Sequence, residues 1–413
     1  MKKILLSLVI TSISAFLPAQ VKNVNLTLNP SYTQQVYFQF GTDKQTPVPV
    51  ADWDLAFLNG PSPQDFATRI NDAADISVYK AASVASDWDN INVGDEGSWT
   101  KLYNNEKEWE EGAFDTAGAS IFAGWGTYNM ATHKIVGSVV FVLKYSDGTY
   151  RKFMIEELFY GYTCKFSTWD GHNWSADETF KLPLTQGTGR SFNYYSLTNN
   201  KLVESIPVDA DWDLLFTQYY SYYKNITMYK VTGALHKSGI KVAKKAKGDT
   251  SAVKDPDFSS EINTIGDGWK ELSGFSYTIP DNKYYIKQEN GTIYKMWFTA
   301  FGGTATGNIS FSYEDVTNSL GIIELEDKSS FGLYPNPTVN KTTTLVYELN
   351  SSSLGNGKVS IFNLTGQKVY EEAITNQSGF YSKELNLYKL NPGIYVLVFQ
   401  AGAFKETKKL IVR

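Results

Sequence analysis

Cysteine and histidine are scarce in this chain. One cysteine, Cys164, and three histidines occur among its 413 residues. A single thiol excludes an internal disulfide and a cysteine-based zinc cluster. Because Cys164 lies far from the N-terminus, we also expect no N-terminal lipid anchor. The folded chain must therefore be stabilised by packing.

The sequence patterns of common catalytic sites are missing as well. HExxH, Walker A, GxSxG and dinucleotide-binding glycine patterns do not occur, so the sequence predicts a protein that is not an enzyme. The net charge is −5, which disfavours general nucleic-acid binding because that requires a basic surface. Apart from the N-terminal segment, no apolar run approaches the length of a membrane span, so we expect no transmembrane helix.

The N-terminus has the features of a secretion signal. Lys2 and Lys3 precede an apolar stretch over residues 4–16 that is too short to span a bilayer. A small residue, Ala19, ends the segment. We therefore predict a signal peptide over residues 1–19, cleaved before Gln20.

Aromatic residues, in contrast, are abundant, and some of them mark an internal repeat. The chain has 24 Phe, 27 Tyr and 10 Trp, a composition typical of sheets. The sequence DWDLAF at 52–57 recurs as DWDLLF at 211–216. An aromatic pair precedes each copy, at 37–38 and at 194–195. Repeats in the same order indicate duplicated structural units.

The repeat predicts two homologous β domains, at 20–177 and 178–316. Each ends with a hairpin pattern, in which Asp147-Gly148 or Asn290-Gly291 lies between strand-like segments. Glycine accepts the positive φ of a two-residue type I′ turn, which we expect at both places. The first copy also carries an acidic insertion that includes residues 106–111.

The repeated DWDL segment has the pattern of a core strand. Trp53, Leu55 and Phe57 share one face at period two, with Asp52 and Asp54 on the other face. The sequence therefore predicts aspartates that cap turns or stay solvated. It also places the two repeated tryptophans in separate cores.

These segments resemble the HmuY-like family, whose founding member is a bacterial surface protein that scavenges haem. The resemblance rests on 211–216, on the closing hairpin YYIKQENGTIYKMWF at 284–298, and on 307–313. It covers the second repeat well and the first more loosely. It implies an all-β fold with a ligand groove, and it raises haem as a cofactor. The candidate haem-binding residues are His133 and His172, since axial ligation needs such side chains beside a flat apolar slot.

Two other functions compete with haem carriage. One is a glycan- or surface-binding adhesin that uses aromatic platforms, and the other is a purely structural surface protein. The candidate platforms are Trp169, Trp174, Tyr219, Tyr220, Tyr222 and Tyr223. The sequence does not name the ligand, which could be a small molecule or a glycan.

After residue 316 the composition changes to a polar linker, 317–330, and then to strand-like segments over 331–413. These segments carry a set of turn and strand motifs at the chain end. The motif residues are Tyr334, Pro335, Asn336, Pro337, Gly366, Gly393 and Tyr395. The module resembles the type A sorting domain of type IX secretion cargo and is expected to form a small β-sandwich.

The sorting resemblance implies a partner and a location. The partner is the type IX secretion machinery, and the location is the cell surface or the extracellular space. The sequence as a whole predicts an all-β protein with two tandem HmuY-like domains and a C-terminal sandwich. We expect a secreted ligand-binding or adhesive protein, with haem binding for iron acquisition as the alternative.

Overall fold

The computed structural model describes residues 20–60, 66–120, 123–184, 188–223, 226–274, 276–317, 330–349, 357–375, 379–401 and 404–413. The expected signal peptide, 1–19, and residues 318–329 of the expected linker lie outside these stretches. The chain forms two compact units. The first ends at Asp315, and the second runs from Val316 to Arg413.

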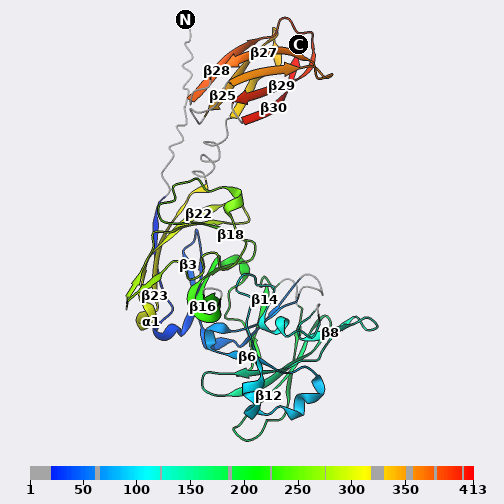
Figure 1. Cartoon of the computed structure of the whole chain (residues 1–413), viewed down its shortest axis with the longest axis vertical. Coiled ribbons are helices and arrows are strands. Elements are labelled where there is room, and N and C mark those ends of the chain that lie inside the picture. Colours follow the sequence, from blue (N-terminus) through cyan, green and yellow to red (C-terminus); the bar gives the residue numbers. More distant parts are fainter. Residues whose placement is uncertain are drawn as a thin grey trace, which may run out of the picture. The chain divides into compact units, whose positions relative to one another are not determined.

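Strands dominate both units (Figure 1), which confirms the predicted all-β class. The described part contains a single short α-helix, α1 (Gly303–Thr306), along with several 3₁₀ helices. These are η1 (Pro30–Tyr32), η2 (Val50–Asp52), η3 (Asp72–Ala74), η4 (Ala85–Asn90), η5 (Val93–Ser98), η6 (Ala113–Thr116), η7 (Asp209–Asp211) and η8 (Asp255–Asp257). Among the described helices, none is both long and apolar enough to cross a membrane.

Two sheets of the first unit form what we call lobe 1. A five-stranded sheet has the order β1-β23-β22-β21-β18, and a four-stranded sheet has the order β17-β16-β2-β3. Their strands are β1 (Lys22–Thr27), β2 (Gln34–Gln39), β3 (Lys44–Pro49), β16 (Leu214–Tyr223), β17 (Thr227–His236), β18 (Lys241–Lys245), β21 (Lys283–Lys287), β22 (Ile293–Phe301) and β23 (Asn308–Asp315), beside a small ribbon of β19 (Glu271–Ser273) and β20 (Ser276–Thr278). Alternate residues of these strands, such as Phe38, Phe216 and Phe311, meet in one core.

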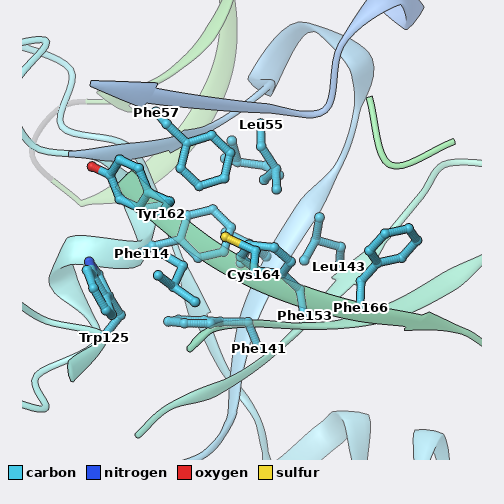
Figure 2. Close-up of a cluster of buried hydrophobic side chains, with 14 of the residues drawn as sticks. Leu55, Phe57, Phe114, Trp125, Phe141, Leu143, Phe153, Tyr162, Cys164 and Phe166 are labelled. Carbon is cyan, nitrogen blue, oxygen red and sulfur yellow. The ribbon is translucent and has the colours of Figure 1, made fainter. Parts of the chain in front are cut away.

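The other two sheets form lobe 2. The larger has the order β13-β12-β11-β10-β6-β7 with β8 and β9 attached, and the smaller has the order β15-β14-β4-β5. Their strands are β4 (Leu55–Leu58), β5 (Thr68–Ile70), β6 (Ser77–Ala82), β7 (Thr100–Leu102), β8 (Gly126–Asn129), β9 (Lys134–Gly137), β10 (Val140–Lys144), β11 (Tyr150–Leu158), β12 (Gly161–Thr168), β13 (Glu178–Pro183), β14 (Phe192–Ser196) and β15 (Lys201–Val203). Figure 2 shows their core, where Phe57, Phe141 and Phe153 surround the buried Cys164.

The two lobes share a strand order, but each is assembled from both repeats. In the large sheets, β1-β23-β22-β21-β18 corresponds to β13-β12-β11-β10-β6, and in the small sheets β17-β16-β2-β3 corresponds to β5-β4-β14-β15. The first three strands of the first repeat thus complete lobe 1, and the first three strands of the second repeat complete lobe 2. The repeats exchange these strands reciprocally.

The folded cores therefore do not follow the expected boundary between residues 177 and 178. Phe38 of the first repeat pairs with Leu214 of the second, while Tyr195 of the second pairs with Leu55 of the first. Both central strands carry the same Leu-x-Phe alternation, so either aromatic hairpin fits either strand. The division by sequence repeat and the division by core are different.

Both predicted hairpins are present, but their turns differ from the expected type. The backbone carbonyl of Tyr145 accepts from the amide of Gly148, and the amide of Tyr145 donates to the carbonyl of Thr149. These two hydrogen bonds leave a loop of three residues. Gly148 has φ +87°, whereas no positive φ occurs at Asp147. This is a type I turn followed by a left-handed glycine. The Asp147 carboxylate favours it by accepting from the amide of Thr149 at 2.8 Å.

The second unit is a sandwich of two sheets, β24-β25-β28 and β27-β26-β29-β30. Its strands are β24 (Ser330–Val339), β25 (Thr342–Leu349), β26 (Gly357–Phe362), β27 (Lys368–Ile374), β28 (Gly379–Asn386), β29 (Gly393–Ala401) and β30 (Phe404–Val412). Side chains from both sheets, such as Leu345 and Phe399, form its core. This is the predicted C-terminal β-sandwich.

Candidate functional site

The two repeated tryptophans lie where the lobes meet. Trp53 and Trp212 belong to one buried cluster that also contains Tyr37 and Phe192. The expectation of separate cores is therefore wrong. Trp53 packs in this cluster, whereas Leu55 packs in the core of lobe 2, so the two side chains do not share a face. Trp53 lies between the 3₁₀ turn η2 and the strand β4. The alternation of the strand does not extend back through that turn.

The exchanged hairpins contact these tryptophans in the same way in both lobes. Tyr37 on β2 packs edge-on against Trp212, with ring centroids 5.2 Å apart. Tyr194 on β14 packs edge-on against Trp53 at 5.0 Å. Burial raises the pKa of both phenols. The four rings join the two repeats into one structure.

The second aspartate of each DWDL segment fastens an exchanged hairpin. The Asp54 carboxylate accepts from the amides of Leu197 and Thr198 at 2.6 and 3.3 Å, just beyond β14. The Asp213 carboxylate accepts from the amide of Phe40 at 2.8 Å, just beyond β2. Burial raises the pKa of both carboxyls, and these hydrogen bonds oppose the shift. The predicted turn-capping role is present, and both carboxylates are buried.

The acidic insertion of the first repeat crosses to lobe 1. The buried Arg69 guanidinium donates to the backbone carbonyls of Asn105, Glu108, Trp109 and Glu111 at 2.8–3.1 Å. It also lies over the Trp109 ring, 5.1 Å from the centroid. Since five N–H groups in a fixed fork suit several carbonyls at once, Arg69 holds this loop in one shape.

Two contacts then join the insertion to lobe 1. Trp109 Nε1 donates to the carbonyl of His236 at 2.9 Å. The amide of Ile262 donates to the carbonyl of Lys107 at 2.8 Å. The insertion therefore lies across the junction of the lobes. The sequence predicts it only as an acidic interruption of the repeat.

A cavity of about 80 Å³, which we call the aromatic slot, opens at this junction. Five aromatic side chains and two leucines form much of its wall, and five polar side chains complete it. Its lining is Tyr37, Leu58, Trp109, Glu110, Ser191, Phe192, Tyr194, Asp209, Trp212, Leu215, Lys237 and Ser238. The residues come from both repeats and from the insertion, so the exchange of strands creates the slot.

The polar groups of the slot are held by one another. Ser191 Oγ donates to Asp209 Oδ2 at 2.6 Å, and Lys237 Nζ donates to the Asp209 carbonyl at 2.7 Å. Ser238 Oγ donates to Glu110 Oε1 at 3.2 Å. A carboxylate still has capacity for further hydrogen bonds after accepting one. The slot thus offers flat apolar walls with acceptors and a cation at fixed positions.

The candidate haem residues lie elsewhere. His133 is exposed in the turn between β8 and β9, with Nδ1 2.8 Å from the Tyr128 hydroxyl. His172 is exposed in the turn after β12. Neither histidine lines the aromatic slot. An axial haem ligand must face a flat apolar pocket, and these two exposed turn residues do not fit that requirement.

The third histidine and the single cysteine are enclosed by protein. His236 is fully buried, with its ring nitrogens 3.0 and 2.8 Å from the carbonyl oxygens of Lys237 and Glu261. Burial lowers its pKa. Cys164 is buried in the core of lobe 2. Within the described stretches, no group of three or more His, Cys, Asp or Glu side chains is placed to hold a metal ion.

The proposed aromatic platforms do not form one surface. Trp169 and Trp174 pack on each other at 5.2 Å in the turn after β12, and Trp174 Nε1 is bonded to the Ile91 carbonyl. Tyr219 is buried, whereas Tyr222 is exposed near the tip of the β16–β17 hairpin.

The sequence does not indicate the slot residues Trp109 and Asp209. The insertion that carries Trp109 has no counterpart in the second repeat, and Asp209 precedes the repeated segment.

The sorting motif residues all lie in the second unit. Asn336 joins β24 to the terminal strand, since its Nδ2 donates to the Lys409 carbonyl at 2.7 Å and its Oδ1 accepts from the Ile411 amide at 2.9 Å. The flanking residues are Tyr334, which is exposed, and the prolines 335 and 337.

The other motif residues shape turns and strand ends in the same unit. Gly366 has φ +81° in the turn between β26 and β27. Gly393 begins β29, and the Tyr395 hydroxyl donates to the Asn391 carbonyl at 2.9 Å. These contacts give the motif a structural role within the sandwich.

Comparisons with known proteins identify this second unit. Residues 332–413 match a family described as secretion system C-terminal sorting domain. A search of curated proteins found no significant match. Among solved structures, apo PinO from Porphyromonas gingivitis is 11% identical, with 72% of this chain and 97% of that chain covered and a TM-score of 0.28. The ectodomain of the C. elegans fusion protein EFF-1 is 7% identical, with 96% and 95% covered and a TM-score of 0.16.

Both structural likenesses are too weak to support an argument, so the HmuY-like resemblance of the first unit stays a prediction. The family match confirms the sorting module and its route of export. Residues 332–413 are a type IX secretion C-terminal sorting domain, and the protein is secreted through the outer membrane to the cell surface or the extracellular space.

Proposed function

We propose that the protein is a secreted, non-enzymatic glycan-binding protein whose ligand occupies the aromatic slot. The observation that carries the proposal is the composition of that slot. Tyr37, Trp109, Phe192, Tyr194 and Trp212 provide aromatic surface, and carboxylates lie beside it. Ligand sites are typically concave and mostly apolar, with a few placed polar groups.

The chemistry of a sugar matches these two kinds of surface. One face of a sugar ring carries C–H groups that pack on an aromatic ring, and its edge carries hydroxyls that both donate and accept. Glu110 and Asp209 can accept from hydroxyls, and Lys237 can donate to them. A slot of about 80 Å³ has room for several water-sized groups, which suits one sugar residue better than a long chain.

The carboxylates favour binding over hydrolysis. The acid catalyst of a glycosidase is kept protonated by an apolar, buried environment. Glu110 is exposed and Asp209 is half-buried, with Asp209 already accepting from Ser191. Secretion to the cell exterior supports the proposal further, because surface glycans are available there.

A glycan array probed with the purified secreted protein tests the proposal. We expect binding to a small set of glycans that share a terminal sugar, and no Soret band when the same protein is mixed with haemin. No binding to any glycan would refute the proposal. A Soret band at stoichiometric haemin would favour the alternative of haem carriage.

A further inference from the structure

A second cavity lies at the junction of the lobes, beyond the aromatic slot. It has a volume of about 50 Å³, and Trp109 and Leu215 line it as well as the slot. Its other walls come from β2, β5, β16, β17, η3 and the start of the insertion, together with Trp53 and Ile262. We call it the polar chamber, because most of the side chains that line it carry polar atoms.

Four residues that line the chamber each carry a buried polar atom with no hydrogen-bond partner among the residues that the structure describes. These atoms are Gln35 Nε2, Trp53 Nε1, Asp72 Oδ1 and Tyr219 OH. Gln35 is 1% exposed, Tyr219 is 4% exposed, and Trp53 and Asp72 are 9% exposed. Buried polar groups in native proteins are nearly always bonded to protein or to bound molecules. Four unbonded atoms around one cavity therefore indicate an occupant.

Two asparagines of the chamber wall are hydrogen-bonded to the backbone around it. Asn104 Oδ1 accepts from the amides of Ile70 and Ala113, and its Nδ2 donates to the Ile70 carbonyl. Asn71 Nδ2 donates to the carbonyls of Val50 and Trp53. These hydrogen bonds hold the wall of the chamber in one shape.

The four atoms define the chemistry of the occupant. Gln35 Nε2 and Trp53 Nε1 are donors, Tyr219 OH donates or accepts, and Asp72 Oδ1 accepts. An anion is disfavoured beside the carboxylates of Asp72 and Glu106, and a cation is disfavoured by the donors and by Arg69 in the wall. A neutral molecule with several hydroxyls meets all four requirements, since each hydroxyl both donates and accepts.

We propose that the polar chamber is a binding site for a small neutral polyol. One hydroxyl donates to Asp72, and the oxygens of neighbouring hydroxyls accept from Trp53, Gln35 and Tyr219. A volume of about 50 Å³ holds only a few water-sized groups, so the ligand is glycerol-sized. The chamber is a site separate from the aromatic slot, and it does not require glycan binding there.

The test is calorimetric titration of the purified secreted protein with glycerol and with erythritol. We expect saturable binding of at least one of them, weakened at least about tenfold by Trp53→Phe and by Asp72→Asn. Asp72→Asn keeps the shape of the side chain and replaces one acceptor oxygen with a donor, whereas Trp53→Phe removes the indole N–H together with part of the ring. Tyr284→Phe and Trp269→Phe are matched controls, because each removes an unpartnered buried polar atom outside the chamber.

The outcomes are distinct. Binding that survives both chamber variants, or that the controls weaken equally, would overturn the assignment. Absence of saturable binding of both glycerol and erythritol would also overturn it. If Asp72→Asn fails to fold, polyol binding by the Trp53→Phe variant alone decides the assignment, because the phenyl ring at position 53 still packs in the aromatic cluster.

Discussion

Tyr37 packs edge-on against Trp212, although the two residues lie 175 positions apart in the sequence and belong to different repeats. Tyr194 makes the equivalent contact with Trp53. Each contact joins an exchanged hairpin to the tryptophan of the other repeat. The two contacts together define the junction in which the aromatic slot lies.

The first prediction concerns the coupling of these rings. A double-mutant cycle with Tyr37→Leu and Trp212→Leu should give non-additive losses in the free energy of unfolding. Edge-to-face aromatic pairs contribute about 0.5–1.5 kcal/mol beyond their burial, and we expect a coupling energy of that size. Chemical denaturation measures it, with Tyr37→Leu and Trp269→Leu as an uncoupled control cycle. Equal coupling energies in the two cycles would show that the exchange contact has no special role.

The second prediction concerns the aspartates that fasten the hairpins. Asp54→Ala removes the acceptor of two backbone amides and should lower the free energy of unfolding by about 1–3 kcal/mol, because buried donors lose their partner. Asp52→Ala is the matched control, since the Asp52 carboxylate accepts from the Ser205 hydroxyl at an exposed position. Urea denaturation compares them. A loss at Asp52 as large as that at Asp54 would contradict the assigned role.

The third prediction concerns pH. Burial raises the pKa of Asp115 from 3.8 to about 7, so the folded state binds a proton that the unfolded chain has already released. The associated stability is fully present below pH 3.8 and is lost as the pH rises through about 7. Asp115→Asn keeps an acceptor for the amides of Thr68 and Gly112 but cannot ionise. Its free energy of unfolding should therefore fall less over this range.

Denaturation of wild type and Asp115→Asn at several pH values measures that difference. The comparison is needed because His236 also makes stability depend on pH, in the opposite direction. Burial lowers the pKa of His236, so the stability that its neutral form contributes is lost as the pH falls through its pKa in the folded state. Parallel pH profiles in the two proteins would show that Asp115 does not titrate in this range.

The fourth prediction concerns export. A chain that ends at Ser330 lacks the sorting domain and should accumulate in the periplasm, because it keeps the expected N-terminal signal and loses the domain that directs it across the outer membrane. Cell fractionation measures its location, with the full-length chain as control. Normal amounts of the truncated protein at the cell surface would contradict this prediction.

Much of the fold could be predicted from local patterns. Period-two alternation and turn glycines gave the β class, the closing hairpins and the C-terminal sandwich. The strand exchange could not be predicted, because Leu55-x-Phe57 and Leu214-x-Phe216 offer the same inward face to either hairpin. Which hairpin pairs with which strand depends on contacts distant in sequence, such as Asp54 with Leu197.

The site was harder to predict than the fold, for a related reason. Its walls come from both repeats and from an insertion without a counterpart, so no sequence motif brings them together. Arg69 donates hydrogen bonds to four backbone carbonyls of the insertion. Every residue has a backbone carbonyl, so no residue type in the sequence indicates these contacts. The chemistry of His133 and His172 suits haem, but the fold places both in exposed turns.

The most direct test of the account is a calorimetric titration of the secreted protein with the strongest glycan found on the array. Trp109→Leu alters the wall of the aromatic slot, whereas Trp169→Leu alters a half-exposed tryptophan in the turn after β12. We predict that Trp109→Leu weakens binding at least about tenfold and that Trp169→Leu leaves it unchanged. Loss of binding on Trp169→Leu, with wild-type affinity for Trp109→Leu, would contradict the placement of the ligand in the slot.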